Sequence, residues 1–232
     1  MAEAHGLNPS TIPMAEGRGA DHAAVAHHFD DSVQQHEAAS LGMWAFLATE
    51  VLFFGGMFLA YTVYRMLYPQ IFSQASNHLD IWLGTINTAV LIASSLTVVL
   101  AVHAAQENKR RVLFWMLLLT VVLGLVFLGI KFTEYHHKFE EHLVPGLNFD
   151  YSGEHGNQAA IFFSLYFAMT GMHALHMVIG IGVFLVLAWE ARRGRYSSLY
   201  HTPVELSGLY WHFVDIIWIF LFPLFYLLGR HT

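Results

Sequence analysis

The sequence predicts an all-α integral membrane protein built as a bundle of five transmembrane helices. Of its 232 residues, 56% are hydrophobic and only 12% are charged, whereas soluble domains are about 25% charged. Five stretches are long and apolar enough to cross a hydrocarbon core of about 30 Å, which takes roughly 20 helical residues. Their continuous apolarity fits helices, which satisfy their own backbone hydrogen bonds in lipid, and not the alternating pattern of barrel strands.

The five predicted helices cover residues 41–64, 81–103, 112–130, 159–189 and 206–228. The fifth has the clearest start, because Thr202-Pro203-Val204-Glu205 combines a capping-box pattern with proline at the first helical position. We therefore expect Glu205 to cap this helix. The longest loop follows the third helix and contains the polar run 134–142. A metal site is one interpretation of this run, but its spacing matches no common zinc signature, and interfacial loops are polar because they are wet.

Residues 1–40 are predicted to form a flexible, acidic, cytoplasmic tail ahead of a transmembrane domain that spans residues 41–230. The tail has one basic residue, Arg18, against six acids: Glu3, Glu16, Asp21, Asp30, Asp31 and Glu37. Its histidines lie among acids and small residues without a repeated spacing: His5, His22, His27, His28 and His36. The segment has no apolar core and is not acid-poor, so it resembles neither a signal peptide nor a transit peptide.

The loops differ in positive charge, which predicts the orientation. Five spans place the termini on opposite sides of the membrane. One side collects seven basic residues: Arg18, Lys109, Arg110, Arg111, Arg192, Arg193 and Arg195. The other side has four: Arg65, Lys131, Lys138 and Arg230. Because cytoplasmic loops carry the excess of Lys and Arg, the N-terminus is predicted to be cytoplasmic and the C-terminus periplasmic.

Glu50 is the foremost ionisable residue inside a predicted span. It lies nine residues beyond Leu41, which places it about 13–14 Å deep, close to the membrane midplane. Burial among apolar residues favours the protonated carboxyl unless a cation or hydrogen-bond donors are near. Two interpretations stay open: a neutral acid hydrogen-bonded to a neighbouring helix, or a group that handles protons or binds lipid.

Two other predicted spans carry polar clusters. His173 and His176 are three residues apart and share one face of the fourth helix, beside the small residues Gly171, Gly180 and Gly182, which suggest close helix packing. These histidines are expected to make polar contacts between helices or with lipid headgroups. The alternative is ligation of metal or haem, with His103 or His212 as further ligands.

Asp215 shares a face of the fifth helix with Trp211, His212 and Trp218, and it is expected to pair with His212 inside the bundle. Trp211, Trp218, Gly55 and Gly56 are expected to pack helices together. The chain has no cysteine, which excludes disulfides, thiolate metal sites and cysteine nucleophiles. It also has no phosphate-binding loop, and nothing in it indicates a nucleic-acid partner.

Three separated motifs resemble subunit III of haem-copper oxidases. They are Thr49-Glu50-Val51-Leu52-Phe53-Phe54-Gly55-Gly56, Met172-His173-Ala174-Leu175-His176 and Trp211-His212-Phe213-Val214-Asp215-Ile216-Ile217-Trp218. Shorter matches are Ile86-Asn87-Thr88, Lys131-Phe132-Thr133-Glu134-Tyr135 and Glu205. The resemblance covers about residues 40 to 230. Many members have seven helices, and this chain resembles the short five-helix bacterial form that lacks the first two.

The resemblance implies an accessory subunit that binds no haem or copper itself. It would pack against the catalytic subunit I and subunit II, which hold haem and copper, in a bacterial inner-membrane complex that receives electrons from cytochrome c. It would support proton uptake and stability during turnover, with phospholipid bound near Glu50, His173, His176, Glu205, His212 and Asp215. Arg192 and Arg193 are expected to contact lipid headgroups.

Other functions remain as alternatives. Relatives in quinol oxidases typically lack the glutamate found at Glu50, which favours a cytochrome c oxidase, but a quinol oxidase or nitric oxide reductase could carry a similar subunit. A membrane haem protein would use His103, His173, His176 and His212. A proton-coupled transporter would use Glu50 and Asp215.

Overall fold

The computed structural model describes residues 31–147, 149, 151, 156–198 and 200–227. The chain divides into two compact units, Met1–Gly42 and Met43–Thr232. The described elements are the helices α2 (Ser32–Leu67), α3 (Pro69–Ser76), α4 (Ile81–Gln106), α5 (Arg110–Glu140), α6 (Gly156–Arg192) and α7 (Thr202–Phe222), and the π-helical turn η1 (Pro223–Leu227). Five segments are long and apolar enough to span a membrane: Val33–Leu67, Ile81–Gln106, Arg110–Glu140, Gly156–Arg192 and Thr202–Leu227. The predicted fold class is confirmed.

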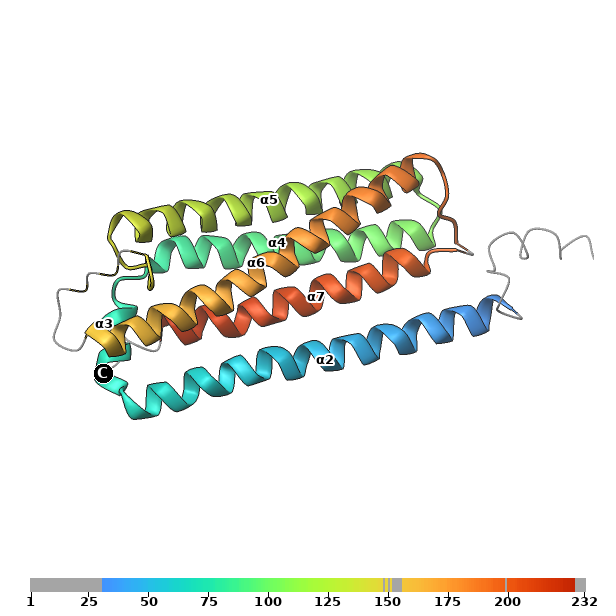
Figure 1. The fold of residues 1–232 in the computed structure, drawn as a ribbon. Coiled ribbons are helices and arrows are strands. Elements are labelled where there is room, and N and C mark those ends of the chain that lie inside the picture. The colour runs from blue at the N-terminus through green and yellow to red at the C-terminus, as the bar shows by residue number, and fades with distance from the viewer. Residues whose placement is uncertain (1–30, 148, 150, 152–155, 199, 228–232) are drawn as a thin grey trace, which may run out of the picture. The chain divides into compact units, whose positions relative to one another are not determined.

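Within the unit that begins at Met43, four helices pack around a common core (Figure 1). Helix α4 contacts α5 and α7, and α6 contacts the same two helices, so the four form a closed ring. The α2 helix is joined to this ring by side chains. The Tyr61 hydroxyl donates to the Leu224 carbonyl at 2.8 Å, and the Phe54 and Phe213 rings meet edge to face.

Trp211 occupies the centre of the four-helix ring. Its indole N–H donates to the Ser94 hydroxyl on α4 at 3.1 Å. A Cβ added at Gly180 on α6 would lie 2.7 Å from this ring, and one added at Gly124 on α5 would lie 3.0 Å from it. Two glycines therefore allow the α5 and α6 backbones to approach the tryptophan, as small residues do in membrane bundles. A Cβ would meet nothing within 4 Å at Gly182, and at Gly171 only the Tyr135 hydroxyl at 3.9 Å, so of the three glycines predicted to pack closely only Gly180 does so.

The helices extend further than the apolar stretches predicted. Helix α2 begins at Ser32 and not at residue 41, because Asp31 accepts a hydrogen bond from the Gln34 backbone N–H at 2.7 Å, as a helix N-cap does. The predicted flexible tail therefore includes residues 32–40, which are helical here, while residues 1–30 lie outside the described part. At the other end of the chain, Pro223 lacks a backbone N–H, and α7 gives way there to the π-helical turn.

Helix α5 continues ten residues beyond its predicted end because its charged residues pair within the helix. Lys131 donates to Glu134 at 3.0 Å, and Lys138 donates to Glu141 at 2.5 Å. Lys131 and Lys138 are each only 3% exposed. The prediction that they are loop charges is wrong. Of the four basic residues counted on that side, these two are buried in α5, Arg65 lies in the last turn of α2, and Arg230 lies outside the described residues.

The Lys131–Glu134 pair joins α5 to α6 and η1. Lys131 Nζ lies 3.0 Å from the hydroxyls of both Tyr166 and Tyr226. The same hydroxyls donate to Glu134 Oε1 at 2.7 and 2.5 Å. The ammonium also lies 5.2 Å from the Trp218 ring centroid, within the range of a cation–π interaction. All charges and donors of this buried cluster are therefore matched across three segments.

Removing one member of this buried pair is expected to destabilise the bundle strongly. Lys131→Met leaves the Glu134 carboxylate without its cation, which typically costs about 3–5 kcal/mol for a buried pair. Changing both residues, Lys131→Met with Glu134→Gln, removes both charges and should recover much of that loss. The measurement is reversible unfolding in mixed micelles. Equal stability of the single variant and the parent would show that the pair does not hold α5 to its neighbours.

Candidate functional site

Glu50 on α2 and His176 on α6 form a polar pair within the spanning segments. Glu50 Oε2 lies 3.1 Å from His176 Nε2, and both side chains are largely buried, with 17% and 11% exposure. The other ring nitrogen, Nδ1, lies 2.8 Å from the Met172 carbonyl oxygen. The Phe54 ring packs edge to face on the imidazole, and the Tyr210 hydroxyl donates to the His176 carbonyl at 3.0 Å.

These contacts limit where protons can be in the pair. A carbonyl oxygen only accepts hydrogen bonds, so Nδ1 of His176 must carry a proton and donate it to Met172. With a neutral imidazole, Nε2 is an acceptor and Glu50 must be the protonated donor. With an ionised Glu50, Nε2 must be protonated and the imidazole positive. In both states one proton lies between Glu50 and His176, and the pair has no net charge.

An apolar groove between α2 and α7 lies on the other side of Phe54, whose ring packs on His176 and also lines the groove. It consists of two cavities of about 630 and 500 Å³ that share Val51, Phe213 and Ile216. One extends to Trp44, and the other to Phe220 and Leu224. Gly55 lines the second cavity, and a Cβ added at Gly55 or Gly56 would meet nothing within 4 Å. Among the described residues, no helix approaches these two glycines closely, so the expected helix packing at Gly55 and Gly56 does not occur there.

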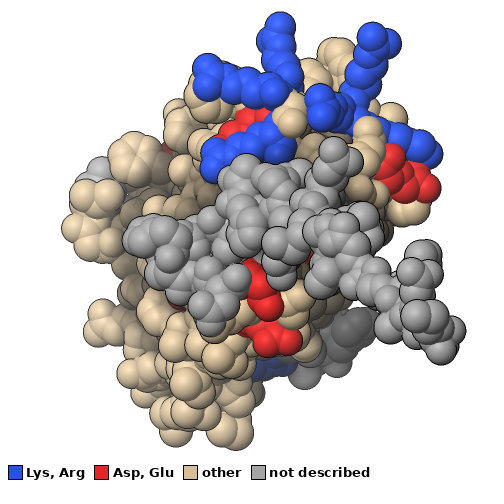
Figure 2. Space-filling view, turned by 90° about the vertical axis from the view of Figure 1, so that its right-hand side faces the viewer, with Lys and Arg blue, Asp and Glu red and all other residues tan. Residues whose placement is uncertain are grey.

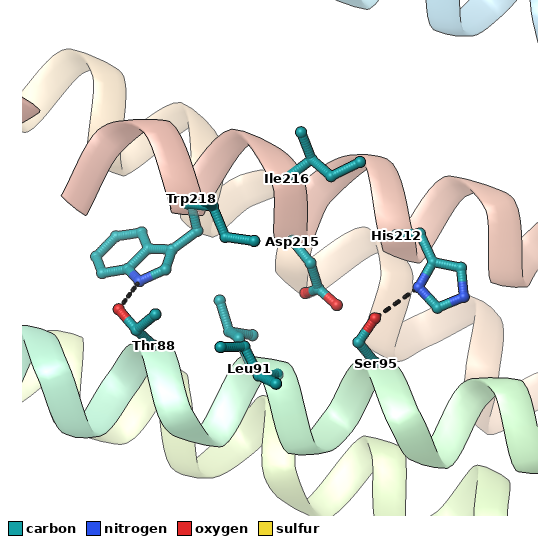
Figure 3. A pocket seen from close by; sticks show the side chains of 9 residues that line it. Thr88, Leu91, Ser95, His212, Asp215, Ile216 and Trp218 are labelled. Carbon is teal, nitrogen blue, oxygen red and sulfur yellow. Dashed lines mark hydrogen bonds between the residues drawn. The ribbon is translucent and has the colours of Figure 1, made fainter. Parts of the chain in front are cut away.

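Asp215 and His212 point into a separate cavity of about 350 Å³, which lies between α7 and α4 (Figure 3). His212 Nδ1 lies 2.7 Å from the Ser95 hydroxyl on α4. Asp215 is 5% exposed, and neither of its carboxyl oxygens has a hydrogen-bond partner among the described residues. The predicted Asp215–His212 pair is therefore wrong, because the His212 imidazole is hydrogen-bonded to Ser95 instead. The sequence did not reveal the position of Ser95.

His173 lies apart from His176 in a ring of aromatic side chains. It is 1% exposed, and its ring packs on Phe127 of α5 and Trp218 of α7. Trp218 donates its indole N–H to Thr88 on α4 at 3.1 Å. His103 forms an ion pair with Glu107 at 3.4 Å near the end of α4. The four histidines considered as haem ligands are thus distributed over separate sites, and no group of three or more metal-ligating side chains occurs among the described residues.

Glu205 connects α7 to α4 and does not form the predicted capping box. The N-cap of α7 is His201, one residue earlier than the box requires. Glu205 Oε1 accepts a hydrogen bond from the Gln106 amide at 2.9 Å and lies 3.2 Å from His201 Nε2. Both contacts lie at the end of the bundle that carries the α4–α5 and α6–α7 connections.

Basic side chains gather at this same end (Figure 2). The exposed ones are Lys109, Arg110, Arg111, Arg192, Arg193 and Arg195. The Arg193 guanidinium lies 3.5 Å from the Trp189 ring centroid, and Arg195 forms an ion pair with Glu190. Burial raises the pKa of Tyr196, whose hydroxyl donates to Glu190. Gly194 has a φ of +77° and faces Arg110, where a Cβ would come within 2.6 Å of the guanidinium.

Sequence reasoning missed several partners of the predicted site residues. Ser95 and Tyr210 lie on helices other than those of the groups they contact, and nothing in their sequence context marks them. Lys131 and Glu134 could have been found, since a lysine three residues before a glutamate on a helix is a standard ion-pair spacing. They were instead assigned to a loop because they are charged.

Comparison with known proteins agrees with this arrangement. The family model of cytochrome c oxidase subunit III matches residues 21–230. Cytochrome c oxidase subunit 3 of Thermostichus vulcanus is 36% identical over 194 residues, 82% of this chain and 87% of that protein. The Mus musculus protein of the same name is 32% identical over 196 residues, 81% of this chain and 69% of that protein. A probable quinol oxidase subunit 3 of Staphylococcus haemolyticus is 29% identical over 202 residues, 86% of this chain and 94% of that protein.

The family match covers all the described residues, including the spans that carry Glu50, His176 and Asp215. The chain belongs to the cytochrome c oxidase subunit III family, the accessory subunits of haem-copper oxidases.

Proposed function

We propose that this chain is subunit III of a bacterial cytochrome c oxidase, with phospholipid bound beside Glu50, and that it sustains proton uptake by the catalytic subunit. It binds no haem or copper itself. Its partners are subunit I and subunit II, which hold those groups, and cytochrome c supplies electrons to the complex. The observation that carries the proposal is the Glu50–His176 pair, which holds one proton next to an apolar groove.

The groove suits the acyl chains of a phospholipid. It is lined almost entirely by apolar side chains of α2 and α7, and filling it with acyl chain removes this surface from any contact with water. Its Trp44 end also includes Leu209, in the second turn of α7, close after the loop that carries Arg192 and Arg193. Cations at this end are suited to a phosphate headgroup.

The charge distribution supports an inner-membrane protein with a cytoplasmic N-terminus. With Lys131 and Lys138 buried in α5, the basic residues in loops lie still more strongly on the side of Arg110 and Arg193. By the positive-inside rule this end of the bundle faces the cytoplasm. Proton uptake from the cytoplasm would then take place on the side where the groove approaches the basic loops.

Glu50→Gln tests the role of the shared proton. The glutamine amide can donate to His176 Nε2, so the fold and the contact between α2 and α6 should survive while the titratable proton is lost. We expect near-normal initial oxygen consumption by the purified complex, but altered proton uptake or faster loss of activity during sustained turnover. Proton uptake and turnover lifetime are measured side by side.

Glu140→Gln is the matched control, because the Glu140 side chain is 62% exposed at the end of α5. This substitution should leave proton uptake and turnover lifetime unchanged. A hydrophobic carbodiimide, which requires a protonated carboxyl reachable from lipid, should label the parent and not the Glu50→Gln variant at this position. Immediate and complete loss of activity in an intact complex would argue against an accessory role. Unchanged proton uptake, lifetime and labelling would make Glu50 a packing residue only.

The absence of cysteine in the chain allows the orientation to be measured directly. Leu147→Cys lies in the α5–α6 connection, where Leu147 is 70% exposed, and Ser198→Cys lies in the α6–α7 connection. An impermeant maleimide added outside intact spheroplasts should label Leu147→Cys, and it should label Ser198→Cys only after permeabilisation. The reverse pattern would invert the proposed topology.

A quinol oxidase is the second candidate, since one similar protein is named a probable quinol oxidase subunit 3. The two differ in the electron donor of the whole complex. Steady-state oxygen consumption with reduced cytochrome c, compared with a quinol, decides between them.

A further inference from the structure

We propose that the groove between α4 and α7 is a proton relay, in which a proton on Asp215 exchanges with the basic end of the bundle through Ser95 and His212. This site does not include Glu50 or His176, although it shares His212 and Ile216 with the lining of the groove between α2 and α7. The relay does not require the function proposed for the Glu50–His176 pair. Its ligands are protons and the water molecules that exchange them.

Asp215 supplies the buried end of the relay. Its carboxyl group points into the 350 Å³ cavity between the two helices (Figure 3) and has no hydrogen-bond partner among the described residues. It lies 13 residues from the start of α7, about 20 Å along the helix axis, near the middle of the span. An unpaired carboxylate at this depth costs several kcal/mol, so the neutral, proton-bearing form is favoured.

Ser95 and His212 supply the next two positions. The Ser95 hydroxyl lies 2.7 Å from His212 Nδ1 and lines the same cavity as the Asp215 carboxyl. A hydroxyl can accept one proton while it donates another. The Asp215 O–H bond breaks as its proton passes, through a water molecule in the cavity, to Ser95 Oγ, and the original Ser95 proton passes to Nδ1 of a neutral His212. The resulting imidazolium releases its Nε2 proton to water.

Water can reach His212 from the loops. His212 also lines another cavity, of about 590 Å³. This cavity continues between α4 and α7 to His103, Gln106 and Glu205. Gly208 lines this cavity between His212 and Glu205 and lets α4 approach α7 closely, since a Cβ there would lie 3.1 Å from the Val98 side chain. A cavity of this size with several polar groups can hold water. Glu205, His212 and Asp215 thus stand in order along one face of α7, from the basic end of the bundle to the membrane midplane.

The other charged groups packed against α7 face different surroundings. On α4, His103 pairs with Glu107, and at the start of α7 His201 pairs with Glu205. On α5 and α6, Lys131 and His173 contact the Trp218 ring, and His176 is paired with Glu50 of α2. Within the described residues, Ser95 and His212 are the groups through which a proton can leave Asp215.

The test is infrared spectroscopy of the purified oxidase complex that contains this chain. The carbonyl band of a protonated carboxyl group should be present in the parent and absent from Asp215→Asn. After transfer to D₂O, exchange of the carboxyl proton for deuterium shifts this band. The exchange should be about tenfold slower in Ser95→Ala than in the parent, the factor expected when a hydrogen bond of roughly 1.4 kcal/mol is lost from the path. Thr85→Val, at an exposed position of α4, should exchange at the parental rate.

Two results would overturn the relay. If Asp215→Asn removes no carbonyl band, Asp215 is ionised and holds no proton. If the band exchanges at the parental rate in Ser95→Ala, the proton reaches Asp215 by another route. Glu50→Gln should remove a different band, if any, and leave the exchange at Asp215 unchanged, so failure of the proposed role of Glu50 is distinguishable from failure of the relay.

Discussion

Polar side chains within the membrane must find partners on other helices, and this constraint determines how the helices of the bundle are joined. An unpaired charge in lipid costs several kcal/mol, so the buried polar groups that do find partners fix the positions of their neighbours. Lys131 and Glu134 hold α5 to α6 and η1 through two tyrosines. Thr97 and Thr120 join α4 to α5 at 2.7 Å. Glu50 and His176 join α2 to α6. Apolar packing around Trp211 fills the space between these links, with Gly124 and Gly180 against its ring.

Asp215 and the Glu50–His176 pair differ from the other buried polar groups because their hydrogen-bonding needs are not fully met by fixed partners. In the Lys131 cluster the ammonium and the Glu134 carboxylate are both paired with described residues, which joins three segments of the bundle. The Glu50–His176 pair is satisfied only when it holds one proton, and it borders an open apolar groove. Asp215 has a cavity in front of it and no hydrogen-bond partner among the described residues. Groups that need an exchangeable proton are where function is expected in a membrane protein.

The number and type of the helices could be predicted from the sequence, because a 30 Å hydrocarbon layer sets both span length and composition. Helix ends could not, because Asp31 caps a helix and Lys131 and Glu134 lie within one, whereas charge was read as a loop signal. The residues Glu50, His176 and Asp215 were identified by their depth in predicted spans. Their partners were not, since Ser95 lies 117 residues from His212 and Glu50 lies 126 residues from His176. The prediction of an Asp215–His212 pair was wrong for this reason. The sequence shows which residues are neighbours along one helix, but it does not show that the Ser95 hydroxyl on α4 competes for His212.

The central claim is that Glu50 and His176 act as one unit that holds a proton beside the lipid groove. It is tested most directly by a double-mutant cycle on the lifetime of the complex during sustained turnover, with Glu50→Gln, His176→Gln and the double variant. Residues that share one function lose it together, so their effects are not additive. The account predicts that all three variants lose activity at the same accelerated rate. A double variant whose effect is the sum of the two single effects, or a His176→Gln variant with the parental lifetime, would contradict it.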